Sequence, residues 1–146
     1  MAKLTLAAAS TILETALAEG RSHNFAPLTV AVLDAGGHLV ALKREDNSSL
    51  LRPEIATGKA WGALGMGFGG RELARRAQNA PGFFTALSGL ADGRMVPVPG
   101  GVLIRDAGGE IVGAVGISGD TSVNDEICDV AGIKTAGLVP DTGDPA

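Results

Sequence analysis

The feature that most constrains the fold is a strand–turn–strand pattern that occurs twice in this chain of 146 residues. The tetrapeptide Asp-Ala-Gly-Gly separates the mostly apolar residues 28–33 from 39–42 in the first copy, and 101–105 from 110–116 in the second. Glycine tolerates the positive φ that tight hairpin turns require. Both copies are therefore predicted to be β-hairpins, and hairpins build an antiparallel sheet.

Helical segments precede, separate and follow the two hairpins. The first is predicted over residues 4–19, with Leu6, Leu13 and Leu17 on one apolar face and Gly20 as its C-terminal stop. The remaining helices are expected at residues 53–64, 71–78, 82–90 and 123–135, the last of them capped by Ser122. This order of elements predicts helices packed against the faces of the sheet.

A fifth, short strand is predicted at residues 95–98, where Pro97 restricts it to the edge of the sheet because proline cannot donate to a ladder. Residues 1–137 then form a single domain. Residues 138–146 are rich in Pro, Gly and Asp and are expected to be a flexible C-terminal tail. The predicted fold class is α/β in the broad sense, more narrowly α+β, with a five-stranded antiparallel sheet flanked by helices.

Composition excludes several classes of partner. The net charge is -4, and the densest basic group, at residues 71–76, is interrupted by Glu72, so no nucleic-acid partner is expected. No apolar run reaches the roughly 20 residues of a membrane span, so no membrane partner is expected either. The single Cys128 excludes an internal disulfide and a thiolate cluster. Because the N-terminus also lacks a secretory signal pattern, we expect a cytoplasmic protein.

Two basic residues are the main candidates for holding a ligand. Arg52 precedes the helix at 53–64, and Lys59 lies in its otherwise apolar stretch, where it either reaches solvent or faces a pocket. Together with the N–H groups of the helix start they could hold a carboxylate or a heme propionate. Gly100 and Gly101 could expose backbone N–H groups to the same ligand. Purely structural or solvated roles remain open for all four residues.

Two acidic residues are candidates for acid/base catalysis, because Asp120 and Glu126 are not needed to cap the last helix. The alternative is that they only stabilise its N-terminus. His23 is a weak candidate for an iron ligand. No metal site is otherwise predicted, because the sequence contains no tight ligand spacing such as H-E-x-x-H.

Four segments in order, at residues 30–42, 55–60, 99–104 and 111–119, resemble the GlcG/HbpS-like family over about residues 4–137. The resemblance implies a profilin-like fold, and it implies homo-oligomers, which we expect to be larger than a dimer and as large as an octamer. Some members of the family bind heme, so the resemblance implies heme as a candidate cofactor of this protein. The sequence departs from the family pattern at residues 118–122 and at Trp61.

Three functions are consistent with the sequence. The first is binding of a small ligand, with heme as one candidate. The second is an enzyme that acts on a small anionic metabolite, with Arg52 and Lys59 as anion anchors and Asp120 and Glu126 as acid and base. The third is a structural, oligomeric accessory protein.

Overall fold

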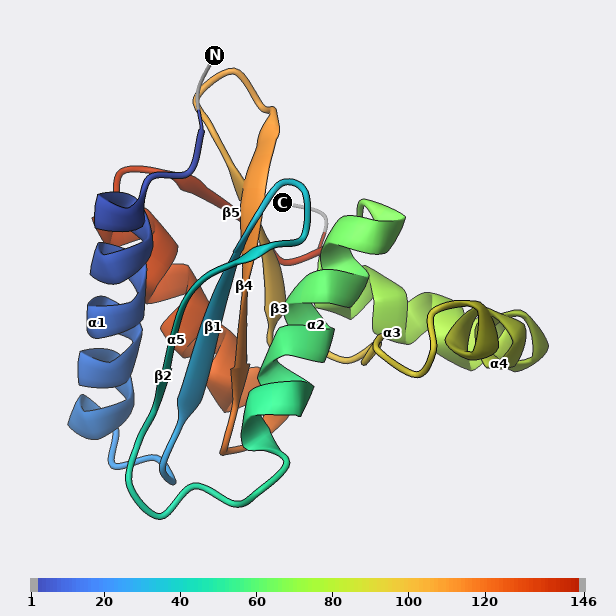
Figure 1. The fold of residues 1–146 in the computed structure, drawn as a ribbon, viewed down its shortest axis with the longest axis horizontal. Helices are drawn as coiled ribbons and strands as arrows, with labels where there is room; N and C mark the ends of the chain where they lie inside the picture. Colours follow the sequence, from blue (N-terminus) through green and yellow to red (C-terminus); the bar gives the residue numbers. More distant parts are fainter. Residues whose placement is uncertain (1–2, 145–146) are drawn as a thin grey trace.

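The computed structural model describes residues 3–144, which form five helices and one five-stranded sheet (Figure 1). The helices are α1 (Leu6–Ser22), α2 (Arg52–Met66), α3 (Gly70–Asn79), α4 (Pro81–Leu90) and α5 (Ser122–Thr135). The strands are β1 (Thr29–Asp34), β2 (Leu39–Arg44), β3 (Gly101–Arg105), β4 (Ile111–Ser118) and β5 (Val139–Asp141). All neighbouring strands are antiparallel, in the order β2-β1-β4-β3-β5. The predicted fold class is confirmed, and so are both hairpins.

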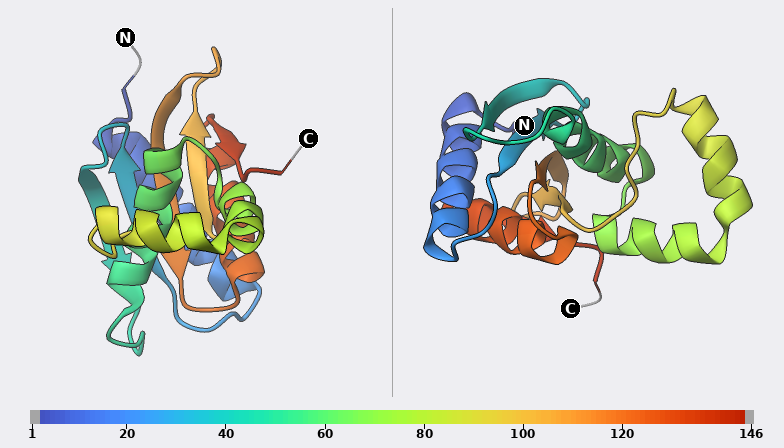
Figure 2. Two further views of the ribbon diagram at one scale, coloured as in Figure 1. Left: turned by 90° about the vertical axis from the view of Figure 1, so that its right-hand side faces the viewer. Right: turned by 90° about the horizontal axis from the view of Figure 1, so that it is seen from below.

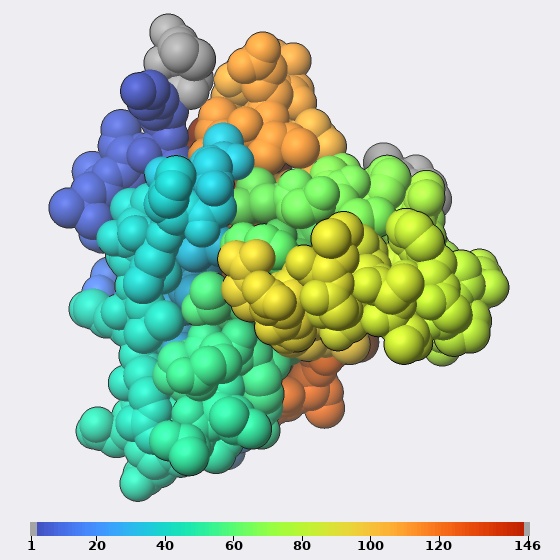
Figure 3. Space-filling view, turned by 45° about the vertical axis from the view of Figure 1, so that its right-hand side comes forward, coloured from blue at the N-terminus to red at the C-terminus, as the bar shows by residue number. Residues whose placement is uncertain are grey.

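Helices cover both faces of the sheet. α1 and α5 pack against each other over one face, while α2 lies on the other face, mainly against β4 (Figures 1 and 2). α3 and α4 extend from α2 as an arm that stands out from the body of the molecule, as the space-filling view shows (Figure 3). Among residues 3–144, no helix combines the length and apolar character that a membrane span needs.

Two glycines are required because α2 packs closely against the sheet and α5 packs closely against α1. A Cβ atom at Gly116 in β4 would lie 1.9 Å from the carbonyl oxygen of Ala56, and one at Gly132 in α5 would lie 2.5 Å from that of Ile12. Both contacts are to backbone atoms, which cannot swing away. Glycine therefore sets how closely α2 approaches the sheet and how closely α5 approaches α1.

Two details of the first helix differ from the prediction. Leu6 was expected to face the core but is 64% exposed, and Ile12 is buried there instead. Gly20 does not end the helix, which continues to Ser22. A Cβ at Gly20 would lie 2.5 Å from Cδ1 of Leu28, so this glycine serves packing inside the helix rather than termination.

The fifth strand comes from a different segment than predicted. Residues 95–98 form no strand; they run along α2, where the Val96 N–H donates to the Gly58 carbonyl over 3.2 Å. β5 instead lies in the segment expected to be a tail, and it pairs with β3 through Ile104 and Pro140. Prolines are tolerated there because β5 is an edge strand.

The cap of the last helix also differs from the prediction. Thr121, not Ser122, precedes the first turn of α5, and its side chain accepts a hydrogen bond from the Asn124 N–H over 3.2 Å. The predicted type of capping residue is right, and its position is wrong by one residue.

Candidate functional site

Lys59 takes neither of the positions that the sequence predicts for it. Its side chain is only 4% exposed, and its Nζ donates to the Ile117 carbonyl at 2.8 Å and to Asp125 Oδ2 at 3.1 Å. Asp125 is itself fully buried. Lys59 and Asp125 are therefore an internal ion pair that joins α2 to α5 at the end of β4.

The Gly100–Gly101 segment makes room for this ion pair. Gly100 has a φ of 107°, a conformation that favours glycine, and a Cβ there would lie 2.9 Å from Lys59 Nζ. A Cβ at Gly101 would lie 2.3 Å from the Lys59 carbonyl oxygen. The structure thus brings Lys59, Gly100 and Gly101 together as the sequence predicts, but they pack against one another and line none of the described cavities.

A second buried carboxyl group lies near the Lys59–Asp125 pair. Asp129 is one helical turn beyond Asp125, and neither of its oxygens has a hydrogen-bond partner among residues 3–144. Burial raises the pKa of Asp129 well above its ordinary value, and the attraction of Lys59 offsets only part of this effect. Burial also raises the pKa of Asp125, despite its ion pair with Lys59. The interior of α5 therefore holds more acidic groups than the one buried lysine can neutralise.

Arg52 lies in the first turn of α2, where its guanidinium donates to two hydroxyl groups. Nε donates to Ser49 Oγ and Nη1 to Ser118 Oγ, each over 3.0 Å. Within residues 3–144 it forms no ion pair, and it lines none of the described cavities. The role of Arg52 as an anion anchor stays a prediction.

Asp120 and Glu126 are already committed to strong interactions. Asp120 accepts hydrogen bonds from the backbone N–H groups of Ala26 and Thr121 and from the Asn124 side chain, and these bonds lower its pKa. The Arg71 guanidinium meets both oxygens of Glu126 at 2.9 Å. Their acid/base role stays a prediction, and their contacts are those of residues that fix the start of α5.

The contacts of His23 are with neighbouring residues of its own segment, and the one thiol of the chain is buried. His23 ends α1, contacts Glu19 at 3.0 Å and stacks on Phe25 with the ring centroids 4.9 Å apart. Cys128 is buried, which raises its pKa to about 12, so the thiol stays protonated and unreactive at neutral pH. The described residues contain no group of three His, Cys, Asp or Glu side chains that could hold a metal ion.

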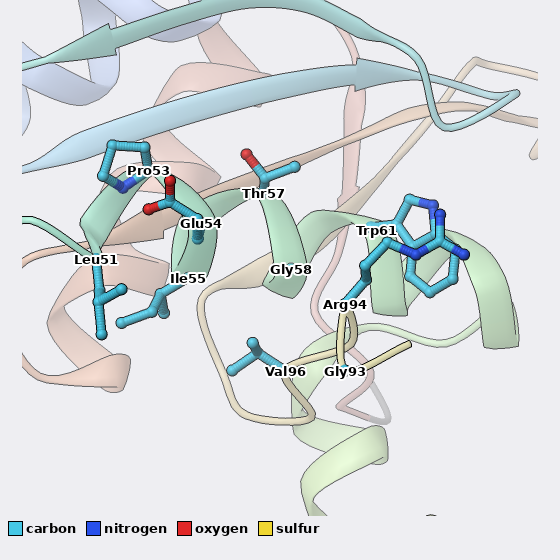
Figure 4. Close-up of a pocket in the computed structure, with 10 residues that line it drawn as sticks. All are labelled: Leu51, Pro53, Glu54, Ile55, Thr57, Gly58, Trp61, Gly93, Arg94 and Val96. Carbon is cyan, nitrogen blue, oxygen red and sulfur yellow. The ribbon is translucent and has the colours of Figure 1, made fainter. Parts of the chain in front are cut away.

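An apolar pocket of about 500 Å³ lies beside α2, between that helix and the segment that returns from the arm. We call it the α2 pocket (Figure 4). It is lined by Leu51, Pro53, Glu54, Ile55, Thr57, Gly58, Trp61, Gly93, Arg94 and Val96. Its volume lies within the range of about 300–1,000 Å³ that small-molecule sites occupy.

One end of the α2 pocket carries a stacked pair. The Arg94 guanidinium carbon lies 4.2 Å from the centroid of the Trp61 ring, a cation–π geometry (Figure 4). Glu54 lies toward the other end of the pocket and forms no ion pair within residues 3–144. Sequence reasoning noted Trp61 as unusual but missed Arg94, which follows the Asp92-Gly93 turn; that dipeptide indicates a turn and not a ligand-binding residue.

The amino-acid sequence of this chain is similar to those of known proteins. A family model described as "Haem degrading protein HbpS-like" matches residues 4–134. An uncharacterized 15.0 kDa protein from the dhaT-dhaS intergenic region of Citrobacter freundii is 29% identical over 127 residues, which cover 87% of each chain.

Solved structures agree with this placement. A PduOC:heme complex superposes with a TM-score of 0.84 at 25% identity, covering 94% of this chain and 97% of the other. HbpS superposes with a TM-score of 0.79 at 26% identity, covering 92% and 90%. The ORFY protein of Klebsiella pneumoniae superposes with a TM-score of 0.82 at 25% identity, covering 94% and 93%. With a matching fold and a family match over most of its length, the chain belongs to the HbpS-like family.

Proposed function

We propose that the protein binds a flat, largely apolar small molecule in the α2 pocket, and that heme is the first candidate. The observation that carries the proposal is the pocket itself, which is open, mostly apolar and bordered by the only tryptophan of the chain. Membership of the HbpS-like family and the likeness to a heme complex of PduOC support heme as the ligand.

The residues of the α2 pocket are chemically compatible with heme. Ile55 and Val96 offer apolar surface to a porphyrin ring, and Arg94, which is stacked on Trp61, offers a cation to a propionate. None of the ten lining residues is His, Cys, Met or Tyr, so a protein ligand to iron from this pocket would be an oxygen of Glu54 or Thr57. When bound, heme would supply a redox-active iron.

A hemin titration tests the proposal. We expect a shifted Soret band that saturates at one hemin per chain. Ile55→Asp, which places a charge in the apolar lining, should weaken binding about tenfold or more because the carboxylate loses hydration against the porphyrin. Leu50→Asp is the matched control, since Leu50 is 84% exposed and does not line the pocket. An unshifted Soret band, or equal loss in both variants, would contradict the proposal. Decay of the band under a reductant would indicate degradation as well as binding.

We also propose that the chain forms a homo-oligomer through the arm. α4 carries no charged residue, and Phe83 and Leu90 are 57% and 81% exposed on it. Apolar surface of this kind on a projecting element is typical of an interface. Light scattering should show an assembly larger than a dimer, and a Phe83→Asp, Leu90→Asp double variant should dissociate it. A monomeric wild-type protein at micromolar concentration would contradict this.

The enzyme alternative is tested separately. If the protein acts on a small anionic metabolite, Asp120→Asn or Glu126→Gln should lower turnover about 10²–10⁴-fold. Unchanged turnover in both variants would remove these residues from any mechanism. The cytoplasmic location stays a prediction that cell fractionation can check.

A further inference from the structure

Arg94 is the one arginine of the α2 pocket lining, and its charge has no acidic partner among residues 3–144. Within residues 3–144 no carboxylate lies within ion-pair distance of it, and Nε donates only to the Ala91 carbonyl, at 3.0 Å. Most other arginines of the chain are paired: Arg21, Arg71, Arg75, Arg76 and Arg105 each contact a carboxylate. Arg94 therefore brings an uncompensated positive charge to the rim of the α2 pocket.

Stacking on Trp61 leaves the N–H groups of the Arg94 guanidinium accessible to a ligand. A cation–π contact occupies the face of the guanidinium, whereas its N–H groups point outward in the plane. Only Nε of Arg94 has a hydrogen-bond partner among the described residues, so the two Nη groups remain able to donate as a pair. Trp61 thus holds the guanidinium in one plane, which lowers the entropy that a ligand would otherwise have to remove.

The opposite end of the pocket has the opposite charge. Figure 4 shows the Glu54 carboxylate well separated from Arg94, with Thr57 and Gly58 of α2 between them. A ligand with a single acidic edge would be attracted at Arg94 and repelled at Glu54. The charges therefore define a direction along the apolar floor.

We infer that Arg94 selects ligands that carry a carboxylate at one edge of a flat aromatic or macrocyclic body. The guanidinium would donate two parallel hydrogen bonds to that carboxylate while the body lies along Ile55 and Val96. This inference rests on the proposed function, because it names the chemical group by which the α2 pocket recognises its ligand. Arg94 is then a specificity-determining residue rather than a catalytic one.

The test compares protoporphyrin IX with its dimethyl ester, which has the same ring but no carboxylate. Neither contains iron, so metal ligation does not enter the comparison. Trp61 is the only tryptophan, so quenching of its fluorescence reports binding at the pocket. Wild-type protein should bind the diacid about tenfold or more tighter than the ester, as expected for a charge-assisted hydrogen bond. Arg94→Gln should bind both with the affinity of the ester, and Arg94→Lys should recover part of the preference.

Arg76→Gln is the matched control, because Arg76 is also stacked on an aromatic ring, that of Phe68 at 4.1 Å, but lies outside the α2 pocket. It should keep the full preference for the diacid. Equal affinity of wild-type protein for diacid and ester would overturn the inference and leave the proposed function standing. A preference that persists in Arg94→Gln would do the same. Failure of both porphyrins to bind would overturn this inference, and the proposed function falls with it only if hemin also leaves the Soret band unshifted.

Discussion

Replacement of Lys59 by methionine is expected to destabilise the protein by about 3–5 kcal/mol, because it leaves buried acid without its cation. Asp125 is fully buried and Lys59 is its ion-pair partner at 3.1 Å. Methionine fills a similar volume, so the loss reports the charge rather than a cavity. Urea unfolding at pH 7 measures the change as a lower midpoint.

Two further variants make this result specific. Lys134→Met removes an exposed lysine from α5 and should change stability by less than about 0.5 kcal/mol. Adding Asp125→Asn to Lys59→Met should restore part of the stability, because the amide oxygen of asparagine can still accept the Asp120 N–H. A Lys59→Met variant as stable as wild type would show that the ion pair contributes nothing to the fold.

The second large effect is a dependence of stability on pH that comes from Asp129. Its pKa is raised in the folded state, so the folded protein binds this proton more tightly than the unfolded chain does. Stability from this group is present at pH values below the ordinary pKa of about 3.9 and is lost as the pH rises toward the folded pKa. Asp129→Asn cannot titrate. Its unfolding free energy relative to wild type should therefore rise by up to about 1.4 kcal/mol per pH unit across that window.

Asp120→Asn is a control, because the contribution of Asp120 to the unfolding free energy should change with pH in the opposite direction. Hydrogen bonds lower the pKa of Asp120 in the folded state, so its contribution is present above the ordinary pKa and is lost as the pH falls through the lowered one. Chemical denaturation of both variants from about pH 2 to pH 8 separates the two trends, because the Asp120 trend lies below its ordinary pKa and the Asp129 trend above its own. Lys59 faces Asp129 from α2, and Asp125 and Glu126 face it from α5. A flat difference between Asp129→Asn and wild type would contradict a raised pKa.

The hairpins could be predicted from the sequence because their signals are local. Alternating or apolar runs on either side of a glycine turn settle a strand pair without knowledge of distant residues. The edge of the sheet could not be settled in this way. Residues 95–98 and Val139–Asp141 are both short, proline-containing segments, and β5 forms because it meets β3, not because of its own propensity.

The α2 pocket was not predicted, since none of the predicted site residues lines it, and the buried ion pair could be anticipated only in part for a similar reason. The sequence marks Lys59 as a charge in an apolar helix, but only the fold shows that Asp125, 66 positions away, lies at its Nζ. Proximity between Lys59 and the Gly100–Gly101 segment was predicted, whereas their burial was not. No sequence pattern indicates a binding role for Arg94, because that role depends on its stacking against Trp61, which lies in a separate segment of the chain.

The position of β1 beside β4 has a consequence for how the chain folds. Each hairpin can form early from neighbouring residues, but the sheet is complete only when β1 meets β4, with α2, the arm and β3 between them in sequence. Such distant pairing slows folding, since chain entropy is lost before contacts are gained. The closure cost grows only logarithmically, by about 0.6 kcal/mol for each doubling of the intervening length. Insertions in the arm would therefore cost the sheet little, which leaves the arm free to vary in length while the sheet stays constant.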